Sequence, residues 1–191
     1  IRHGETEWSK SGQHTGRTDI PLTRNGRKRA AELEPLLRHR AFGLTLSSPM
    51  ERARDTAKLA GLTPDGIDDD LVEWDYGAWE GRTTPDIRVE LGDPNWVIWD
   101  HPIPPGKTPG ETTDEVALRC HRVIERCVPV LDAGRDCALI AHGHVLRILT
   151  ATWLGLHSDA GRLFMLEAGA LSSLGFERTQ HVITGWNQTP E

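Results

Sequence analysis

A continuous apolar run near the end of the chain, Ala138-Leu139-Ile140-Ala141, most restricts the folds open to this sequence. Such a run is typical of a strand that is buried on both faces of a parallel sheet. It ends at His142-Gly143-His144, and a helical pattern follows from Val145 to Leu154, with Gly155 as the stop. Strands that alternate with helices in this way predict an α/β domain.

Other segments continue the alternation. Leu44-Thr45-Leu46 predicts a short strand, and Ser48-Pro49-Met50-Glu51 predicts a helix start with Ser48 as N-cap. A capping box at Thr112 and Glu115 opens an amphipathic helix. The remaining expectations are a strand end at Ile1, an irregular segment from Glu5 to Leu22, a helix after the N-cap Thr23 in preference to a hairpin turn at Asn25-Gly26, loop and short strand from Gly61 to Gly81, and late strands at 171–176 and 182–184.

Together these elements predict three layers, a mostly parallel sheet with helices on both faces. One domain is expected to span residues 1–191, because this length suffices to bury a core. The proline-rich stretch 82–111, here called the cap segment, predicts a short helix followed by a small irregular cap. Since a strand normally precedes a motif like the one that begins at Arg2, we expect residues upstream of Ile1.

Charge and composition exclude several classes of partner. The formal net charge of −6 argues against sequence-independent binding to nucleic acid, so an anionic ligand must be held by a local cluster of positive groups. No run of 18 apolar residues exists, and no membrane partner is expected. Three cysteines without C-x-x-C spacing predict reduced thiols and a cytoplasmic protein. Association into a homo-oligomer is left open.

Basic and imidazole side chains recur where strands give way to helices. Arg2 and His3 follow the first strand, Arg52 lies in the first turn after the second, and His142 follows the apolar run. Ligands of open α/β sheets lie outside the carboxyl ends of the strands, so these junctions should meet at one pocket. Arginines, imidazoles and helix N-termini together predict a site for phosphate or another compact oxyanion.

Glu73 is the candidate acid. It lies in a stretch that also contains Trp74, Tyr76 and Trp79. A carboxyl group beside aromatic surface keeps its proton longer than a solvated one does, which suits it to protonate a leaving oxygen. Histidine is a known covalent nucleophile, and we expect His3 to take this role.

Each candidate also has a plain structural explanation. Arg52 alone would be a surface charge on a helix, Glu73 a solvated carboxylate and His142 a histidine that hydrogen-bonds at a strand end. His142-x-His144 resembles part of a metal site, but companion ligands at suitable spacing are missing, so no metal is expected. Tryptophans near the presumed pocket are core residues by default, although an aromatic wall would favour ring-bearing substrates: Trp74, Trp79, Trp96 and Trp99.

Four motifs occur in a fixed order along the whole chain: Arg2-His3-Gly4-Glu5-Thr6, Ser48-Pro49-x-x-Arg52-Ala53-x-x-Thr56-Ala57, Glu73-x-x-Tyr76-Gly77-x-Trp79-Glu80-Gly81 and His142-Gly143. This order resembles the histidine phosphatase superfamily, in its phosphoglycerate-mutase-like branch. Within that branch, Gly12-Gln13-His14-Thr15-Gly16 and Ala60-Gly61-Leu62-Thr63 resemble bacterial acid phosphatases. The first string also resembles the sedoheptulose-bisphosphatase group.

The resemblance implies a phosphatase that needs no metal or other cofactor and acts on a small phosphorylated substrate. His3 would attack the phosphoryl group to form a phosphohistidine, while Glu73 protonates the departing hydroxyl. Water would then attack, with Glu73 as the proton acceptor. Arg2, Arg52 and His142 would hold the phosphoryl oxygens during both steps.

Further phosphate contacts are implied for Ser9, Thr15, Gly16 and Gly143. Ser9 stands where mutases of the family commonly carry Asn, and Thr15-Gly16 matches a loop that closes over the substrate. Gly143 would offer its backbone N–H. Glu111-Thr112 resembles the family's G-E-S segment with Thr in place of Ser. The resemblance assigns no role to His144.

Two other functions are compatible with the same groups. A phosphoglycerate mutase would return the phosphoryl group to another hydroxyl, and it would need an insertion rich in groups that retain the bisphosphorylated intermediate. The segment between Glu73 and His142 is compact, which favours hydrolysis. A non-catalytic module that binds phospho-ligands is the other alternative, and the presence of the whole catalytic set argues against it.

Overall fold

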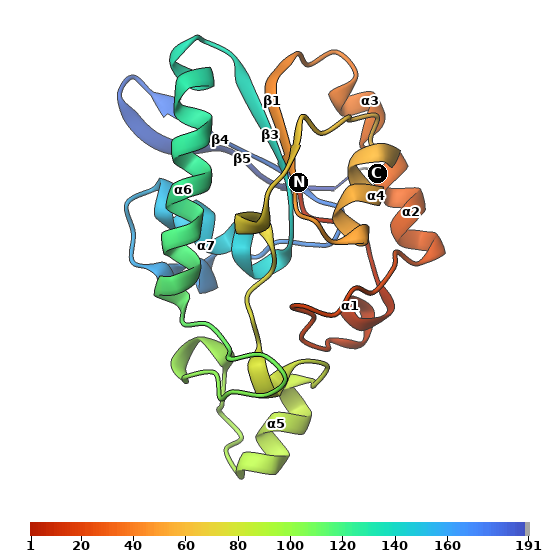
Figure 1. Ribbon diagram of the computed structural model, residues 1–191, viewed down its shortest axis with the longest axis vertical. Helices are drawn as coiled ribbons and strands as arrows, with labels where there is room; N and C mark the ends of the chain where they lie inside the picture. Colours follow the sequence, from red (N-terminus) through yellow and green to blue (C-terminus); the bar gives the residue numbers. More distant parts are fainter. Residues whose placement is uncertain (190–191) are drawn as a thin grey trace.

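Three parallel strands form the centre of the protein, whose computed structural model describes residues 1–189 (Figure 1). β1 (Phe42–Ser47) lies between β2 (Gly66–Ile67) and β3 (Asp136–Ile140). All pairings in this sheet are parallel, and the last pair of β1 and β3 is Ser47 with Ile140. Both of these strands therefore end at the same edge of the sheet.

The first residues of the chain join this edge. Arg2 forms a parallel bridge with Ala141, and the His3 N–H donates to the Ala141 carbonyl at 2.9 Å. The Arg2 N–H donates to the Ala170 carbonyl, just before β4. As a result, the segment that carries Arg2 and His3 enters the sheet between β3 and the chain that leads into β4.

The expected late strands are present as a hairpin. β4 (Leu171–Glu177) and β5 (Gln180–Gln188) pair antiparallel with each other and form a second sheet. A cavity of about 600 Å³ lies between β3 and β4, with Ile1, Leu139 and Leu171 in its wall.

Helices cover both faces of the parallel sheet, because successive strand residues point to opposite sides. On one face, α4 (Glu51–Leu59) packs Ala53 and Ala57 against Ala138 and Ile140. On the other, α6 (Thr113–Asp132) and α7 (Gly143–Trp153) form one cluster with Leu46, Leu139 and Ala141. The predicted three-layer α/β fold with a mostly parallel central sheet is confirmed.

The other helices are short. They are α1 (Glu7–Ser11), α2 (Arg24–Ala31), α3 (Glu34–Leu37) and α5 (Thr84–Leu91), with the 3₁₀ helices η1 (Asp69–Leu71), η2 (Gly77–Trp79), η3 (Ile98–Asp100) and η4 (Ser158–Leu163). Two predicted caps are confirmed: Thr23 caps α2, and the Thr112–Glu115 box opens α6. The segment from Glu5 to Leu22 is less irregular than expected, because Thr6 and Ser9 form a capping box that opens α1.

The predicted N-cap at Ser48 is wrong. α4 begins two residues later, with Met50 as N-cap and no side-chain cap bond. The hydroxyl of Ser48 contacts Nε2 of His142 at 2.7 Å instead. An acceptor for the helix end comes from another part of the chain, since the Glu51 N–H donates to Oδ2 of Asp19 at 2.9 Å.

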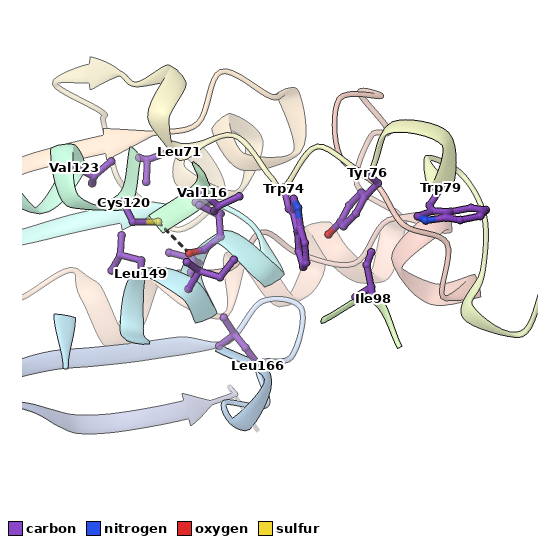
Figure 2. Close-up of a cluster of buried hydrophobic side chains, with 14 of the residues drawn as sticks. Leu71, Trp74, Tyr76, Trp79, Ile98, Val116, Cys120, Val123, Leu149 and Leu166 are labelled. Carbon is purple, nitrogen blue, oxygen red and sulfur yellow. Dashed lines mark hydrogen bonds between the residues drawn. The ribbon is translucent and has the colours of Figure 1, made fainter. Parts of the chain in front are cut away.

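The cap segment extends from one end of the domain (Figure 1). It contains the expected short helix as α5, followed by irregular chain and η3. Figure 2 shows Trp74, Tyr76 and Trp79 in a row that carries the core cluster from α6 and α7 toward Ile98 of this segment. Aromatic packing thereby ties the cap segment to the body of the domain.

Cys120 and Cys127 are buried on α6, and all three cysteines are free thiols. Within residues 1–189, the longest and most apolar helices still fall short of what crossing a membrane requires.

Candidate active site

His3 lies at the strand edge with a defined ring orientation. It is buried, and Nδ1 lies 2.7 Å from the Gly4 carbonyl oxygen. A carbonyl can only accept, so Nδ1 carries the proton and Nε2 keeps its lone pair. Burial, followed by the charges of Arg52 and Arg2, lowers the pKa of His3 well below its usual value. His3 is therefore a neutral imidazole with a nucleophilic Nε2.

Arg2 brings an uncompensated positive charge to this edge. One of its terminal nitrogens donates to the Leu166 carbonyl, while its buried Nε has no partner among the described residues. No carboxylate of residues 1–189 lies within 4.0 Å of the guanidinium. A half-buried cation with an unpartnered buried N–H is stabilised by an anion, and Arg2 is thus suited to bind one.

Arg52 is fully buried and holds the loop before α2. Its Nη1 donates to the Thr18 carbonyl at 2.8 Å, and its Nη2 donates to the Gly16 carbonyl at 3.0 Å. Its Nε donates to Nδ1 of His142 at 3.1 Å. The charge of Glu73 acts on Arg52 and on Arg2, opposing the lowering of their pKa values that burial causes.

His142 is held at both ring nitrogens. Nδ1 accepts from Arg52, so Nε2 carries the proton and donates to Ser48. The rings of His142 and His3 lie 5.1 Å apart between centroids, at an angle of 62°. Burial, with Arg52 as the next cause, lowers the pKa of His142 well below its usual value. The two histidines are thus neutral neighbours.

The carboxylate of Glu73 is held at the start of α7. Its Oε1 accepts the N–H of Val145 at 2.8 Å and that of Trp74 at 2.9 Å, and its Oε2 accepts the N–H of His144 at 3.0 Å. The first N–H groups of a helix have no partner within the helix. Main-chain donors, rather than the aromatic surface expected from the sequence, surround this carboxylate and hold it beside the segment that bears His142.

Behind Glu73, Arg119 fixes the chain that carries it. Its Nη1 donates to the Val72 carbonyl at 2.6 Å and its Nη2 to the Glu73 carbonyl at 3.1 Å. Its Nε and Nη2 also donate to the two oxygens of Glu111, and Glu111 Oε2 accepts the Asp75 N–H at 2.9 Å. This buried ion pair sets the backbone on both sides of Glu73.

Three of the four residues expected to contact phosphate make contacts within the protein. The Ser9 hydroxyl accepts from the Thr6 N–H at 2.8 Å in the capping box of α1. The Thr15 hydroxyl donates to the Gln13 carbonyl at 3.0 Å. The Gly16 N–H donates to Oε2 of Glu80 at 2.9 Å. Their roles toward phosphate stay predictions, and they would require these hydrogen bonds to be exchanged.

Two glycines allow close approaches here. A Cβ on Gly16 would lie 2.6 Å from the Trp74 carbonyl oxygen. A Cβ on Gly143 would lie 3.2 Å from Cζ of Arg2, so the guanidinium of Arg2 packs directly on the start of α7. In addition, the N–H of Gly143 has no partner within residues 1–189 and is open to a ligand.

His144 belongs to an aromatic group beside Glu73. Its Nδ1 hydrogen-bonds with the Tyr76 hydroxyl, and its ring lies 5.0 Å from that of Trp99. His14, for which the sequence suggested no function, packs against Tyr76 at 5.0 Å. Burial lowers the pKa of His144 well below its usual value and that of His14 to about 4. Both imidazoles are neutral.

These buried neutral histidines predict a stability that falls on acidification. In the unfolded chain histidine takes up a proton near pH 6.5, whereas folded His3 and His142 resist protonation. Below that pH the unfolded state binds more protons, so the free energy of unfolding decreases as pH falls. We expect these two residues to lower the free energy of unfolding by about 2 kcal/mol between pH 7 and pH 5.5.

Urea unfolding at pH 7.0, 6.0 and 5.5 measures this loss, above the range in which carboxylates titrate. His3→Asn should reduce the dependence by the share of one buried histidine, whereas replacing the exposed His39 should leave it unchanged. A free energy of unfolding that is constant over this range would contradict the assignment of neutral buried histidines.

Sequence reasoning missed several residues that organise the site. Ser48 was expected to cap a helix, and Glu80 appeared only as part of a motif. Arg119 had a detectable signal, because it falls on the apolar face of α6 with Val116 and Val123, where a charge needs a partner. Within the described part of the chain, no three His, Cys, Asp or Glu side chains are grouped so as to hold a metal ion.

Comparisons with known proteins agree with this geometry. A family model described as Histidine phosphatase superfamily (branch 1) matches residues 1–189. The acid phosphatase of Mycobacterium tuberculosis is 36% identical over 179 residues, which cover 93% of this chain and 85% of that protein. The sedoheptulose 1,7-bisphosphatase of Saccharomyces cerevisiae is 39% identical over 186 residues, covering 82% of this chain and 66% of that protein. A solved structure of the Mycobacterium tuberculosis open reading frame Rv3214 matches with a TM-score of 0.90 and 35% identity, covering 100% of this chain and 96% of that one.

Proposed function

Because the chain belongs to the histidine phosphatase superfamily, branch 1, as its four ordered motifs predicted, we propose that it is a metal-independent phosphomonoesterase acting through a phosphohistidine. The observation that carries the proposal is the state of His3, a neutral imidazole with a free Nε2 beside the half-buried cation Arg2 and the buried cation Arg52. Such a pair of cations attracts a phosphoryl group, and such a ring can attack it.

In the first step, Nε2 of His3 forms a bond to phosphorus while the bond from phosphorus to the ester oxygen breaks. Glu73 transfers its proton to that oxygen, so the alcohol leaves neutral. In the second step, water gives a proton to Glu73 and attacks phosphorus, and the bond to Nε2 breaks. Inorganic phosphate leaves, and Glu73 carries the proton for the next turnover.

Positive and polar groups stabilise the charge that spreads over the phosphoryl oxygens. Arg2 needs no rearrangement, because its Nε is already without a partner. Arg52 would exchange its hydrogen bond to the Gly16 carbonyl for one to a phosphoryl oxygen. The open N–H of Gly143 completes the set together with His142, whose Nε2 would exchange its contact with Ser48 for a phosphoryl oxygen.

The relatives named as acid phosphatase and sedoheptulose 1,7-bisphosphatase support hydrolysis of small phosphorylated molecules as the overall reaction. Three free cysteines support a cytoplasmic location, where thiols stay reduced.

Phosphate release from four substrate classes tests the proposal: sugar phosphates, phosphoglycerates, nucleotides and aryl phosphates. We expect turnover of at least one class, with no change after treatment with a chelator. The same samples should be analysed for conversion of 3-phosphoglycerate to 2-phosphoglycerate. Efficient isomerisation without net hydrolysis would show a mutase instead, and binding without turnover of any substrate would show a non-catalytic module.

A further inference from the structure

Arg147 is a second guanidinium near Glu73 that lacks a counter-ion. It is half-buried, yet no carboxylate of residues 1–189 lies within 4.0 Å of it. Its Nε and Nη2 donate at 3.0 Å to the carbonyls of Gly161 and Arg162, and these neutral groups do not balance its charge. Its Nη1 has no partner in the same part of the chain. A guanidinium that is partly removed from water is stabilised by an anion, and Nη1 of Arg147 is free to bind one.

The position of Arg147 on α7 directs it toward the reaction site. Every residue of this helix from Gly143 to Trp153 is buried except His144 and Arg147. Residues three apart share one face of a helix, and their side chains lean toward its N-terminus. That N-terminus is where Glu73 accepts the N–H groups of His144 and Val145. Arg147 therefore lies on the open face of α7, behind the candidate acid.

Trp99 of the cap segment packs against both Arg147 and His144. Cζ of Arg147 lies 4.8 Å from the centre of the Trp99 ring, and the His144 ring lies 5.0 Å from it. Tyr76 holds His144 through its hydroxyl. The surface between α7 and the cap segment is thus cationic at Arg147, and aromatic and uncharged around it.

The charges that face Arg147 come from the active site itself. Burial lowers the pKa of Arg147, the charge of Glu73 opposes this effect, and Arg2 adds to it. Arg147 in turn helps to lower the pKa of His144. Arg147 and the site therefore share one electrostatic environment. A bound phosphoryl group would neutralise the charge of Arg2 and leave the charge of Arg147 without a counter-ion.

We propose that Arg147 binds an anionic group on the leaving group, so that the preferred substrates are phosphomonoesters whose alcohol carries a carboxylate or a second phosphate. This inference rests on the proposed function, because Glu73 marks the leaving-group side as the donor of a proton to the departing oxygen. His144, which donates its N–H to Glu73, contacts the Trp99 ring, and Arg147 packs on the same ring. Arg2 binds the phosphoryl group, and Arg147 binds the second anionic group of the substrate.

Matched substrates test the idea. One pair is 3-phosphoglycerate and glycerol 3-phosphate, which differ in a carboxylate against a hydroxymethyl group. The other is fructose 1,6-bisphosphate and fructose 6-phosphate, which differ in a second phosphate. We expect kcat/KM to favour the more anionic member of at least one pair, and the pair that responds identifies the anion. Arg147→Gln should lower kcat/KM for that member about tenfold or more and leave its partner nearly unchanged, as loss of one charged hydrogen bond implies.

Two further variants separate binding from support of the fold. Arg147→Lys keeps the charge and loses the fork of hydrogen bonds to η4, so it should retain most of the preference. Arg88→Gln is the matched control, because it removes another half-buried guanidinium, one that bonds the Trp96 carbonyl at 2.9 Å in the cap segment. It should leave the ratio within each pair unchanged. Thermal unfolding of each variant reports loss of structure independently.

The outcomes are distinct. An equal loss on both members of each pair in Arg147→Gln would mean that the residue only anchors η4, and it would overturn the inference. A wild-type enzyme that hydrolyses both members equally well would overturn it too, while leaving the proposed phosphatase intact. Absence of phosphate release from all four compounds and from aryl phosphates would instead refute the proposed function.

Discussion

His3→Ala should lower phosphate release by about a thousandfold or more, with the fold retained. Nε2 of His3 is the only protein atom that forms a bond to phosphorus in the proposed reaction, and the loss of this nucleophile removes both steps at once. The cost to the fold is expected to be small, because the ring makes a single hydrogen bond, to the carbonyl of its neighbour Gly4.

Initial rates with the best substrate measure the effect, and His39→Ala, at an exposed position, serves as the control. Rapid quenching into alkali should trap a phosphorylated histidine in the wild type and none in His3→Ala. Burial, Arg52 and Arg2 keep the pKa of His3 low, so it needs no deprotonation above pH 6, and its availability should not limit the rate between pH 6 and 8. Residual activity close to that of the wild type would refute the assignment of the nucleophile.

Glu73→Gln should slow the reaction by about a hundredfold to ten-thousandfold, the usual range for a general acid or base. The loss should be greatest for alkyl phosphates, whose leaving alcohols need a proton, and smaller for 4-nitrophenyl phosphate, whose phenolate leaves without one. A plot of log kcat/KM against the pKa of the leaving group should therefore become steeper.

Stability must be measured in parallel, because the amide presents an NH₂ where one carboxylate oxygen now accepts an N–H. That mismatch is expected to cost about 1–3 kcal/mol. Glu125→Gln changes an exposed carboxylate on α6 and is the matched control. If Glu73→Gln lowered activity equally for all leaving groups, the carboxylate would be a positioning group and not the proton donor.

The arrangement of layers was predictable because it depends on local patterns. The apolar run at 138–141 predicted a buried strand, and the capping residues Thr23 and Thr112 correctly predicted two helices. Hydrophobic periodicity and capping act over a few residues, so they can be read without knowing what lies across the domain. Ser48 shows the limit of this reasoning, since its hydroxyl contacts His142, which lies 94 positions away in the sequence.

The gathering of the candidate residues at one edge of the sheet was predictable, and the contacts that each of them makes were not. Junctions at the carboxyl ends of β1 and β3 had to meet, because parallel strands end at one edge, and Arg2, Arg52 and His142 do meet there. Which partner each group takes depends on geometry across the chain. No local sequence pattern predicts that Glu73 accepts N–H groups of α7. Nor does any predict that Arg119 donates to the Glu73 carbonyl.

The amino-acid order by itself determined the class of fold and the edge of the sheet at which the candidate site residues gather, because strand and helix periodicity fix where each side chain emerges. Only the tertiary structure decided which charges are compensated. It left Arg2 and Arg147 without carboxylates while pairing Arg119 with Glu111. The physical reason is that the energy of a buried charge depends on what lies within a few ångströms, and those neighbours come from distant parts of the chain.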